Sequence, residues 1–117
     1  MINNDPIWID IDCVGETTKE RYYGRFQIKK YLTNKEKADV YRTANTISVG
    51  IQNVSEIGFL HNLAFLEKHV ISSDASWWKT KDGETPGLDL LDEKPIYELS
   101  NKIYEVQNPV KEEEKNV

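Results

Sequence analysis

Residues 7–13 read Ile7-Trp8-Ile9-Asp10-Ile11-Asp12-Cys13, a strict alternation that predicts a half-buried strand. The isoleucines and Cys13 share one face of an extended chain, and Trp8 and the two aspartates share the other. A second alternating run places Tyr22, Gly24, Phe26 and Ile28 on one face and Tyr23, Arg25, Gln27, Lys29 and Tyr31 on the other. Two such runs, joined by the short polar segment 14–20, predict an antiparallel β-hairpin with one face on a core.

The period then changes to that of helices. Thr33-Asn34-Lys35-Glu36 matches a capping box, and apolar residues follow at helical spacing, so we expect a helix from about 34 to 47. Ser55 is expected to cap a second helix, which we predict to be central and buried on most sides. Its two apolar stripes are Ile57, Leu60, Ala64 and Ile71, and Phe59, Leu63, Leu66 and Val70. Pro95 suits the first turn of a third helix, whose apolar stripe is Ile96, Leu99, Ile103 and Val106.

The predicted fold class is α+β, an N-terminal antiparallel β-hairpin packed with about three α-helices and followed by a disordered acidic C-terminal tail. Residues 72–94, between the second and third helices, are predicted to be an irregular connection. We expect one domain over residues 1–108, because 117 residues suit a single core. Pro109 ends the last helix, and residues 109–117 are predicted to be a charged flexible tail.

Composition narrows the function classes. The single cysteine excludes an internal disulfide and a multi-cysteine zinc site. No run approaches the roughly 18 apolar residues of a membrane-spanning helix, and the first residues do not resemble a secretory signal, so we expect a cytoplasmic protein with no membrane partner. The net charge of −5 argues against bulk binding to nucleic acid or anionic lipid.

No residue pattern predicts catalysis, a cofactor or a metal site. Asp10 and Asp12 share a strand face and can hold a divalent cation, but cross-strand pairing with Arg25 and Lys29 is the favoured interpretation. His61 and His69 would be about 12 Å apart on one helix, too far to share a metal ion. A nucleophile elbow, a phosphate loop and a calcium loop are all missing from the sequence. We therefore expect a protein that is not an enzyme.

Charge is distributed unevenly along the chain. Residues 19–37 contain seven basic residues and two acids, a local balance of +5 that leaves −10 for the remainder. Tyr23, Arg25, Lys29 and Tyr31 are predicted to stand together on the outer hairpin face, and aromatic rings interleaved with cations are typical of single-stranded nucleic acid binding. The neighbouring aspartates oppose phosphate approach, so pairing across the hairpin is favoured over this role.

Trp77-Trp78 is the least common local feature of the sequence. Two interpretations stay open. Both rings close the bottom of the core, or one anchors the connection while the other is an exposed hot spot for a protein partner. The candidate protein-interaction residues are Trp77, Trp78, Tyr23, Arg25, Lys29 and Tyr31.

Several short motifs together suggest a family. Trp8 to Gly15 leads to Tyr23-Gly24-Arg25-Phe26-Gln27-Ile28-Lys29-Lys30-Tyr31-Leu32-Thr33-Asn34-Lys35-Glu36, and Trp77-Trp78, Gly87-Leu88-Asp89-Leu90-Leu91-Asp92 and Pro95-Ile96-Tyr97-Glu98-Leu99 follow later. Over residues 8–106 this arrangement resembles small morphogenesis proteins of tailed bacteriophages, some of them tail assembly chaperone-like. The resemblance implies non-catalytic binding to a phage structural or tail protein, in the cytoplasm of an infected bacterial cell or in the virion.

The sequence is therefore compatible with two functions. The first is a protein-binding module, a phage tail assembly chaperone or a minor virion structural component. The alternative is a small regulatory or inhibitory protein that binds nucleic acid or a host nucleoprotein through the basic hairpin. An open hairpin edge is also compatible with oligomers, because it can extend a sheet between subunits.

Overall fold

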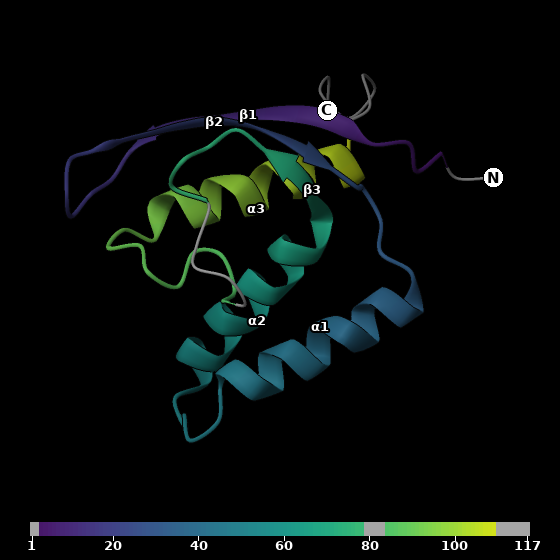
Figure 1. The fold of residues 1–117 in the computed structure, drawn as a ribbon, viewed down its shortest axis with the longest axis vertical. Helices are drawn as coiled ribbons and strands as arrows, with labels where there is room; N and C mark the ends of the chain where they lie inside the picture. Colours follow the sequence, from purple (N-terminus) through teal and green to yellow (C-terminus); the bar gives the residue numbers. More distant parts are fainter. Residues whose placement is uncertain (1–2, 79–83, 110–117) are drawn as a thin grey trace, which may run out of the picture.

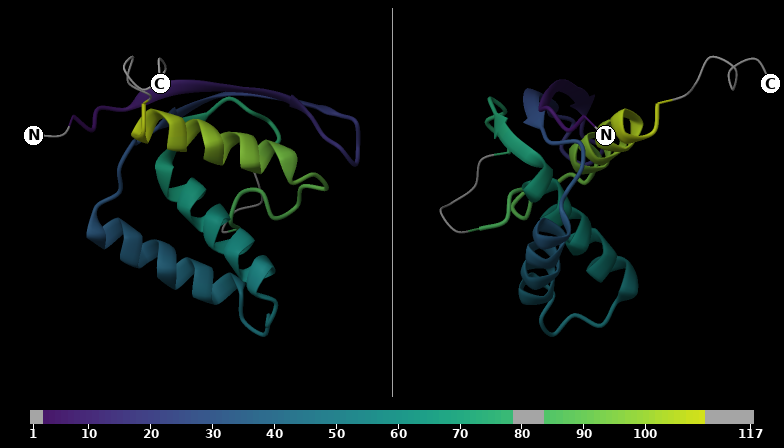
Figure 2. Two further views of the ribbon diagram at one scale, coloured as in Figure 1. Left: turned by 180° about the vertical axis from the view of Figure 1, so that it is seen from behind. Right: turned by 90° about the vertical axis from the view of Figure 1, so that its right-hand side faces the viewer.

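The computed structural model describes residues 3–78 and 84–109 and confirms the predicted α+β class. The elements follow in the order β1 (Ile7–Val14), β2 (Arg21–Ile28), α1 (Asn34–Ile47), α2 (Val54–His69), β3 (Val70–Ser73) and α3 (Lys94–Gln107). The strands form one antiparallel sheet in the order β1-β2-β3. The three helices lie on the same side of this sheet, with α2 between α1 and the strands (Figure 1; Figure 2 shows the same arrangement from behind).

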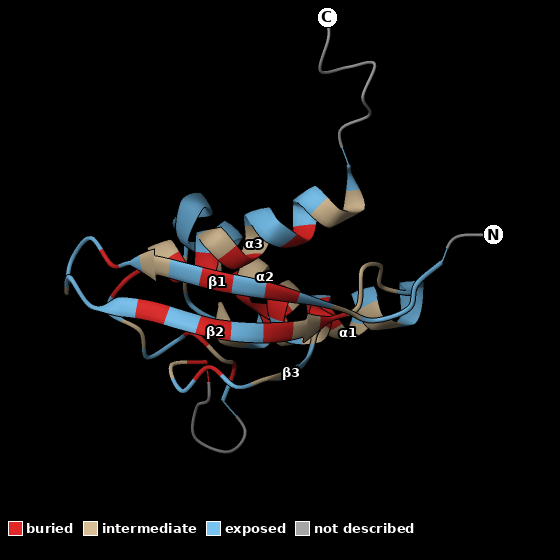
Figure 3. Cartoon of the chain, turned by 90° about the horizontal axis from the view of Figure 1, so that it is seen from above, coloured by how far each residue is buried: buried red, intermediate tan, exposed pale blue. Residues whose placement is uncertain are grey.

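The predicted hairpin and its two faces are confirmed. β1 and β2 pair from Ile7 opposite Ile28 to Val14 opposite Arg21. Phe26 and Ile28 are completely buried, whereas the outer residues of both strands are mostly exposed. Figure 3 shows this alternation along the two strands, seen from the side that the helices do not cover. The inner face packs on the core because its apolar side chains recur with the period of the strand.

The second strand is shorter than the alternation predicted. β2 ends at Ile28, so Lys29 and Tyr31 do not continue its outer row. The Lys29 backbone N–H donates to the His69 carbonyl at 2.8 Å, and the Tyr31 N–H donates to Asn4 Oδ1 at 3.0 Å. These bonds turn the chain out of the sheet and toward α1.

The capping box of the first helix is confirmed. The Glu36 N–H donates to Thr33 Oγ1 at 3.2 Å, and the Thr33 N–H donates to Glu36 Oε1 at 3.0 Å. The predicted cap of the second helix is wrong, because Asn53 takes the role assigned to Ser55. Asn53 Oδ1 accepts the Glu56 N–H at 3.0 Å, and asparagine is as good a cap as serine.

A third strand replaces the predicted last turn of the second helix. α2 ends at His69, and Val70 has an extended backbone with φ −78° and ψ 117°. β3 pairs with β2 around a register shift at Gln27 and Ile28, and Ile71 is half exposed rather than part of a helical stripe. The free edge of β2 supplies hydrogen bonds that compete with the helix for these β-branched residues. The predicted connection therefore starts after residue 73.

The third helix and its apolar stripe are confirmed. Pro95 lies in the first turn of α3, and Ile96, Leu99 and Ile103 are buried against the sheet and α2. A second small cluster joins Val40 and Ala44 of α1 to Ala64 of α2. Residues 79–83 of the predicted connection and residues 110–117 of the predicted tail lie outside the described residues.

Gly24 allows the segment after β3 to approach β2 closely. A Cβ atom at residue 24 would lie 2.9 Å from Ala75 Cα and closer still to Ala75 Cβ. Nonbonded carbon atoms normally sit about 3.5–4.0 Å apart, so no side chain fits here. This close approach places Trp77 and Trp78 under the sheet.

Candidate binding surface on the sheet

The outer face of the hairpin is a two-column surface that we call the outer sheet face. The register places four residues of β1 opposite four of β2 on this side. They are Trp8 opposite Gln27, Asp10 opposite Arg25, Asp12 opposite Tyr23, and Val14 opposite Arg21. Trp8 and Tyr23 are 50% and 55% exposed, so two large aromatic side chains of this face are half in solvent. No helix covers the hairpin on this side (Figure 3).

Each arginine of this face forms an ion pair with a carboxylate and a cation–π contact with an aromatic ring. Arg25 Nε lies 3.3 Å from Asp10 Oδ1, and its guanidinium sits 5.0 Å from the centre of the Trp8 ring. Arg21 donates from Nε and Nη2 to the two oxygens of Asp12 at 2.8 and 2.7 Å, and its guanidinium lies 5.1 Å from the Tyr23 ring. These contacts limit the rotamers of the two exposed aromatic side chains.

The charges of the outer sheet face cancel. The bidentate hydrogen bonds from Arg21 lower the pKa of Asp12 and raise that of the arginine, so both groups stay ionised as a pair. The expected Asp10–Arg25 pair is confirmed, whereas the expected role of Lys29 opposite the aspartates is wrong. The surface therefore presents aromatic rings among matched charges rather than a basic patch.

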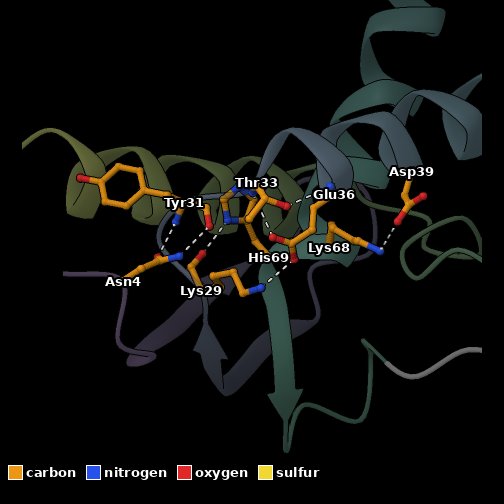
Figure 4. Close-up of polar contacts among 8 residues, drawn as sticks. All are labelled: Asn4, Lys29, Tyr31, Thr33, Glu36, Asp39, Lys68 and His69. Atoms are coloured by element: carbon orange, nitrogen blue, oxygen red, sulfur yellow. Dashed lines mark hydrogen bonds and ion pairs between the residues drawn. The ribbon is translucent and has the colours of Figure 1, made fainter. Parts of the chain in front are cut away.

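Lys29 and Tyr31 belong instead to the junction between β2 and α1 (Figure 4). Lys29 Nζ lies 2.6 Å from Glu36 Oε2. This bond and the Thr33 backbone bond hold the pKa of Glu36 at about 2. The Tyr31 carbonyl accepts a bond from Asn4 Nδ2 at 3.0 Å. Two predicted interaction residues thus fix the path of the chain from the sheet into α1.

Both predicted tryptophan candidates pack against the core. Trp78 is 7% exposed and its ring meets Phe26 edge-on, with centroids 5.6 Å apart. Trp77 is half-buried, its centroid is 5.4 Å from that of Phe26, and its Nε1–H donates to the Tyr23 carbonyl at 3.1 Å. Both rings therefore pack against Phe26 on the inner face of β2. The tryptophan on the outer sheet face is Trp8, which is half exposed. Sequence reasoning left Trp8 out of the candidates, although the alternation had already placed it on that face.

The two histidines occupy different environments. His69 is buried, and its Nδ1 lies 2.6 Å from the Lys29 carbonyl, which requires the proton to sit on Nδ1. Burial lowers the pKa of His69, so the ring is neutral at pH 7. His61 is half-buried on α2, with its ring 6.3 Å from the Tyr41 ring. The described residues contain no group of three or more His, Cys, Asp or Glu that could hold a metal ion.

Asp92 is a buried carboxylate that sequence reasoning did not single out. Its Oδ1 accepts the Thr17 N–H at 2.7 Å, and its Oδ2 accepts the Thr18 and Tyr22 hydroxyls at 2.5 and 2.8 Å. The Thr18 hydroxyl bond is the main reason that the pKa of Asp92 falls to about 2. Gly15 leaves the space that the carboxylate occupies. Asp92 thus ties the hairpin loop to the start of α3, across more than 70 residues of sequence.

Several surface hollows lie beside the helices. One of about 430 Å³ opens near His69 and is lined by Tyr31, Leu32, Lys37, Phe65, Gln107 and Asn108. The Gln107 amide already donates to the Lys30 carbonyl. Another hollow of about 420 Å³ lies beside Asp92, whose carboxylate oxygens are engaged by the hairpin loop and Tyr22. The outer sheet face differs from both in presenting large exposed side chains held in place.

Comparison with known proteins found no family model, no curated protein and no solved structure that matches this chain. Within the described ranges, no helix combines the length and the apolar character needed to cross a membrane.

Proposed function

We propose that this protein is a non-catalytic binding module that recognises another protein through its outer sheet face. The observation that carries the proposal is the pair of half-exposed rings, Trp8 and Tyr23, each stacked on an arginine that an aspartate holds. Tryptophan, tyrosine and arginine are the residue types most enriched at binding hot spots. Rings whose rotamers are already restricted lose less conformational entropy when a partner binds.

The sequence resemblance to tailed-phage morphogenesis proteins supplies the candidate partner class. On this proposal the protein acts as a tail assembly chaperone or a minor virion component and binds a phage structural or tail protein. The outer sheet face suits such a partner because its charges are matched, so binding rests on ring burial and hydrogen bonds rather than on net charge.

The test is an affinity purification of the tagged protein from phage-infected cells, with mass spectrometry of the proteins that come with it. We expect Trp8→Ala and Tyr23→Ala each to lower partner recovery about tenfold or more, as loss of a hot-spot residue does. Tyr104→Ala is the matched control, because Tyr104 is 65% exposed on α3, away from the outer sheet face. Circular dichroism verifies that the three variants fold. Equal recovery with all three variants would refute the use of this face.

The same purification tests the nucleic acid alternative. The arginines of the outer sheet face and Lys29 lie in ion pairs with Asp10, Asp12 and Glu36, which leaves less uncompensated positive charge than the sequence suggested. Nucleic acid binding depends steeply on salt because counterions are released. Loss of every co-purified protein after nuclease treatment would overturn the protein-binding proposal in favour of this alternative.

A further inference from the structure

The hydrogen bonds of the hairpin determine which way the backbone of β1 points. Just beyond the strands, the Gly15 N–H donates to the Glu20 carbonyl at 2.8 Å, in register with Val14 opposite Arg21. Bonded and non-bonded pairs alternate in an antiparallel ladder, so the odd-numbered residues of β1 direct their N–H and C=O groups to β2.

The other side of β2 agrees with this assignment. The Arg25 N–H donates to Asp74 Oδ1 at 2.8 Å, and the Arg25 carbonyl accepts from Ser73 Oγ at 2.8 Å. The odd-numbered residues of β2 therefore point to β3, and the even-numbered ones point to β1. Even residues of β2 stand opposite odd residues of β1, as the register requires.

The even-numbered residues of β1 consequently direct their backbone groups to the open edge of the sheet. These residues are Trp8, Asp10, Asp12 and Val14, and β1 is the first strand in the sheet order. None of their backbone N–H or C=O groups has a hydrogen-bond partner within residues 3–78 and 84–109. The row extends over roughly 20 Å, and such an edge is a ready template for another strand.

The side chains on this edge select against a second copy of the same strand. In an antiparallel pair of β1 edges, even residues stand opposite even residues, because those residues carry the free groups. The antiparallel registers with the most overlap place Asp10 opposite Asp12, Asp10 opposite Asp10, or Asp12 opposite Asp12 of the other copy. Carboxylates directly opposite each other, with Cβ atoms about 4.5–5.5 Å apart, are destabilising. Antiparallel pairing of two copies is therefore disfavoured, and the edge is better suited to a foreign strand.

Charge also indicates what that foreign strand carries. The two aspartates lie in the column of the outer sheet face nearest the edge, and their arginine partners lie one strand further away. A neighbouring strand would sit about 4.8 Å from β1, so its side chains would meet the carboxylates before the guanidiniums. The carboxylates stay partly exposed and can accept further bonds, because each has about four lone-pair sites.

We propose that β1 accepts an extended segment of a partner protein as a fourth strand, with lysine or arginine at alternate positions beside Asp10 and Asp12. This inference rests on the proposed function and specifies how the same partner reaches the outer sheet face. The added strand lies next to Trp8, so one segment bonds to the backbone edge while its outward side chains contact the ring and the carboxylates. Main-chain bonds supply affinity in this mode, and the alternate side chains supply specificity.

Amide hydrogen exchange tests the edge directly. The probe is a short capped peptide that alternates arginine with threonine, and an otherwise identical peptide with glutamate is its control. In the free protein the amides of Trp8, Asp10 and Asp12 should exchange fast, and those of Ile9 and Ile11 slowly. The arginine peptide should slow exchange at the three even-numbered residues. Unchanged exchange at saturating peptide, or equal protection by the glutamate peptide, would overturn the proposal.

Two substitutions of Asp10 distinguish the contribution of its backbone N–H from that of its carboxylate. Asp10→Ala and Asp10→Pro both remove the carboxylate, but only proline also removes the outward N–H, which the β1–β2 ladder does not use. We expect the peptide to bind Asp10→Pro roughly tenfold more weakly than Asp10→Ala. Equal affinity in two variants that are both folded by circular dichroism would refute edge pairing. Partner recovery can also fall on substitution of Trp8 and Tyr23 and yet be equal for Asp10→Ala and Asp10→Pro. That result would refute pairing at the β1 edge while leaving the proposed function intact.

Discussion

Replacing Gly24 by alanine measures how tightly the segment after β3 is packed on the sheet. The added methyl carbon would sit 2.9 Å from Ala75 Cα and closer to its Cβ, whereas carbon atoms in contact are about 3.5–4.0 Å apart. The obstruction includes backbone, so the segment must move away by about 1 Å, which weakens the two bonds between Arg25 and Asp74 and the packing of Trp78. Forced overpacking of this kind costs about 1–3 kcal/mol.

The assay is urea unfolding at pH 7, followed by tryptophan fluorescence and by circular dichroism. Gly58→Ala is the matched control, because Gly58 lies inside α2 and a Cβ there would meet nothing within 4 Å. The same substitution should therefore stabilise the protein at residue 58, by about 0.5–1 kcal/mol, through helix propensity. Gly24→Ala should therefore lower the free energy of unfolding, and Gly58→Ala should raise it.

A second substitution tests whether Ala75 is the cause. Ala75→Gly removes the methyl group that the new side chain meets first, while the backbone of residue 75 still obstructs it. In the double variant, Gly24→Ala should therefore cost less than it does alone, and the difference is the coupling energy of the pair. Wild-type stability of Gly24→Ala, or strict additivity of the two changes, would refute the close-approach argument.

Three further predictions concern single groups. Thr33→Ala removes the acceptor for the Glu36 N–H and should lower the free energy of unfolding by about 1 kcal/mol, measured by urea unfolding. Asp92 and Glu36 have pKa values of about 2 in the fold, whereas the ordinary values are 3.8 and 4.5. The two carboxylates should therefore stabilise the fold fully above pH 4.5, and this stabilisation should be lost as pH falls toward 2. Urea titrations at successive pH values should show a weaker pH dependence of the free energy of unfolding for Asp92→Asn. Burial lowers the pKa of His69 below 6.5, so only the unfolded chain takes up the proton at first and stability should decrease as pH falls below 6.5. His69→Asn keeps an N–H donor for the Lys29 carbonyl, so this variant should not lose stability below pH 6.5 in the same way. An NMR titration that gives a His69 pKa above 6.5 would contradict the prediction.

Local periodicity along the chain was enough to predict several elements of the fold. Alternation in residues 7–13 and 22–31 predicted the hairpin and its two faces, although β2 ends at Ile28. The capping box at Thr33 predicted where α1 begins. Pro95 and the stripe after it specified α3. These features follow from backbone geometry, which repeats every two residues in a strand and every 3.6 in a helix, so neighbours along the chain are enough to specify them.

Other features depend on contacts between residues that are distant in sequence. Val70 and Ile71 continue a helical pattern, and they form β3 only because the edge of β2 lies beside them. Alternation predicts Lys29 on the outer face of the hairpin, but its ion pair with Glu36 places it at the start of α1. Asp92 is one acid of an irregular connection until the fold brings the hairpin loop to it. Hydrogen bonds and burial act through space, so no pattern in neighbouring residues could have indicated these partners.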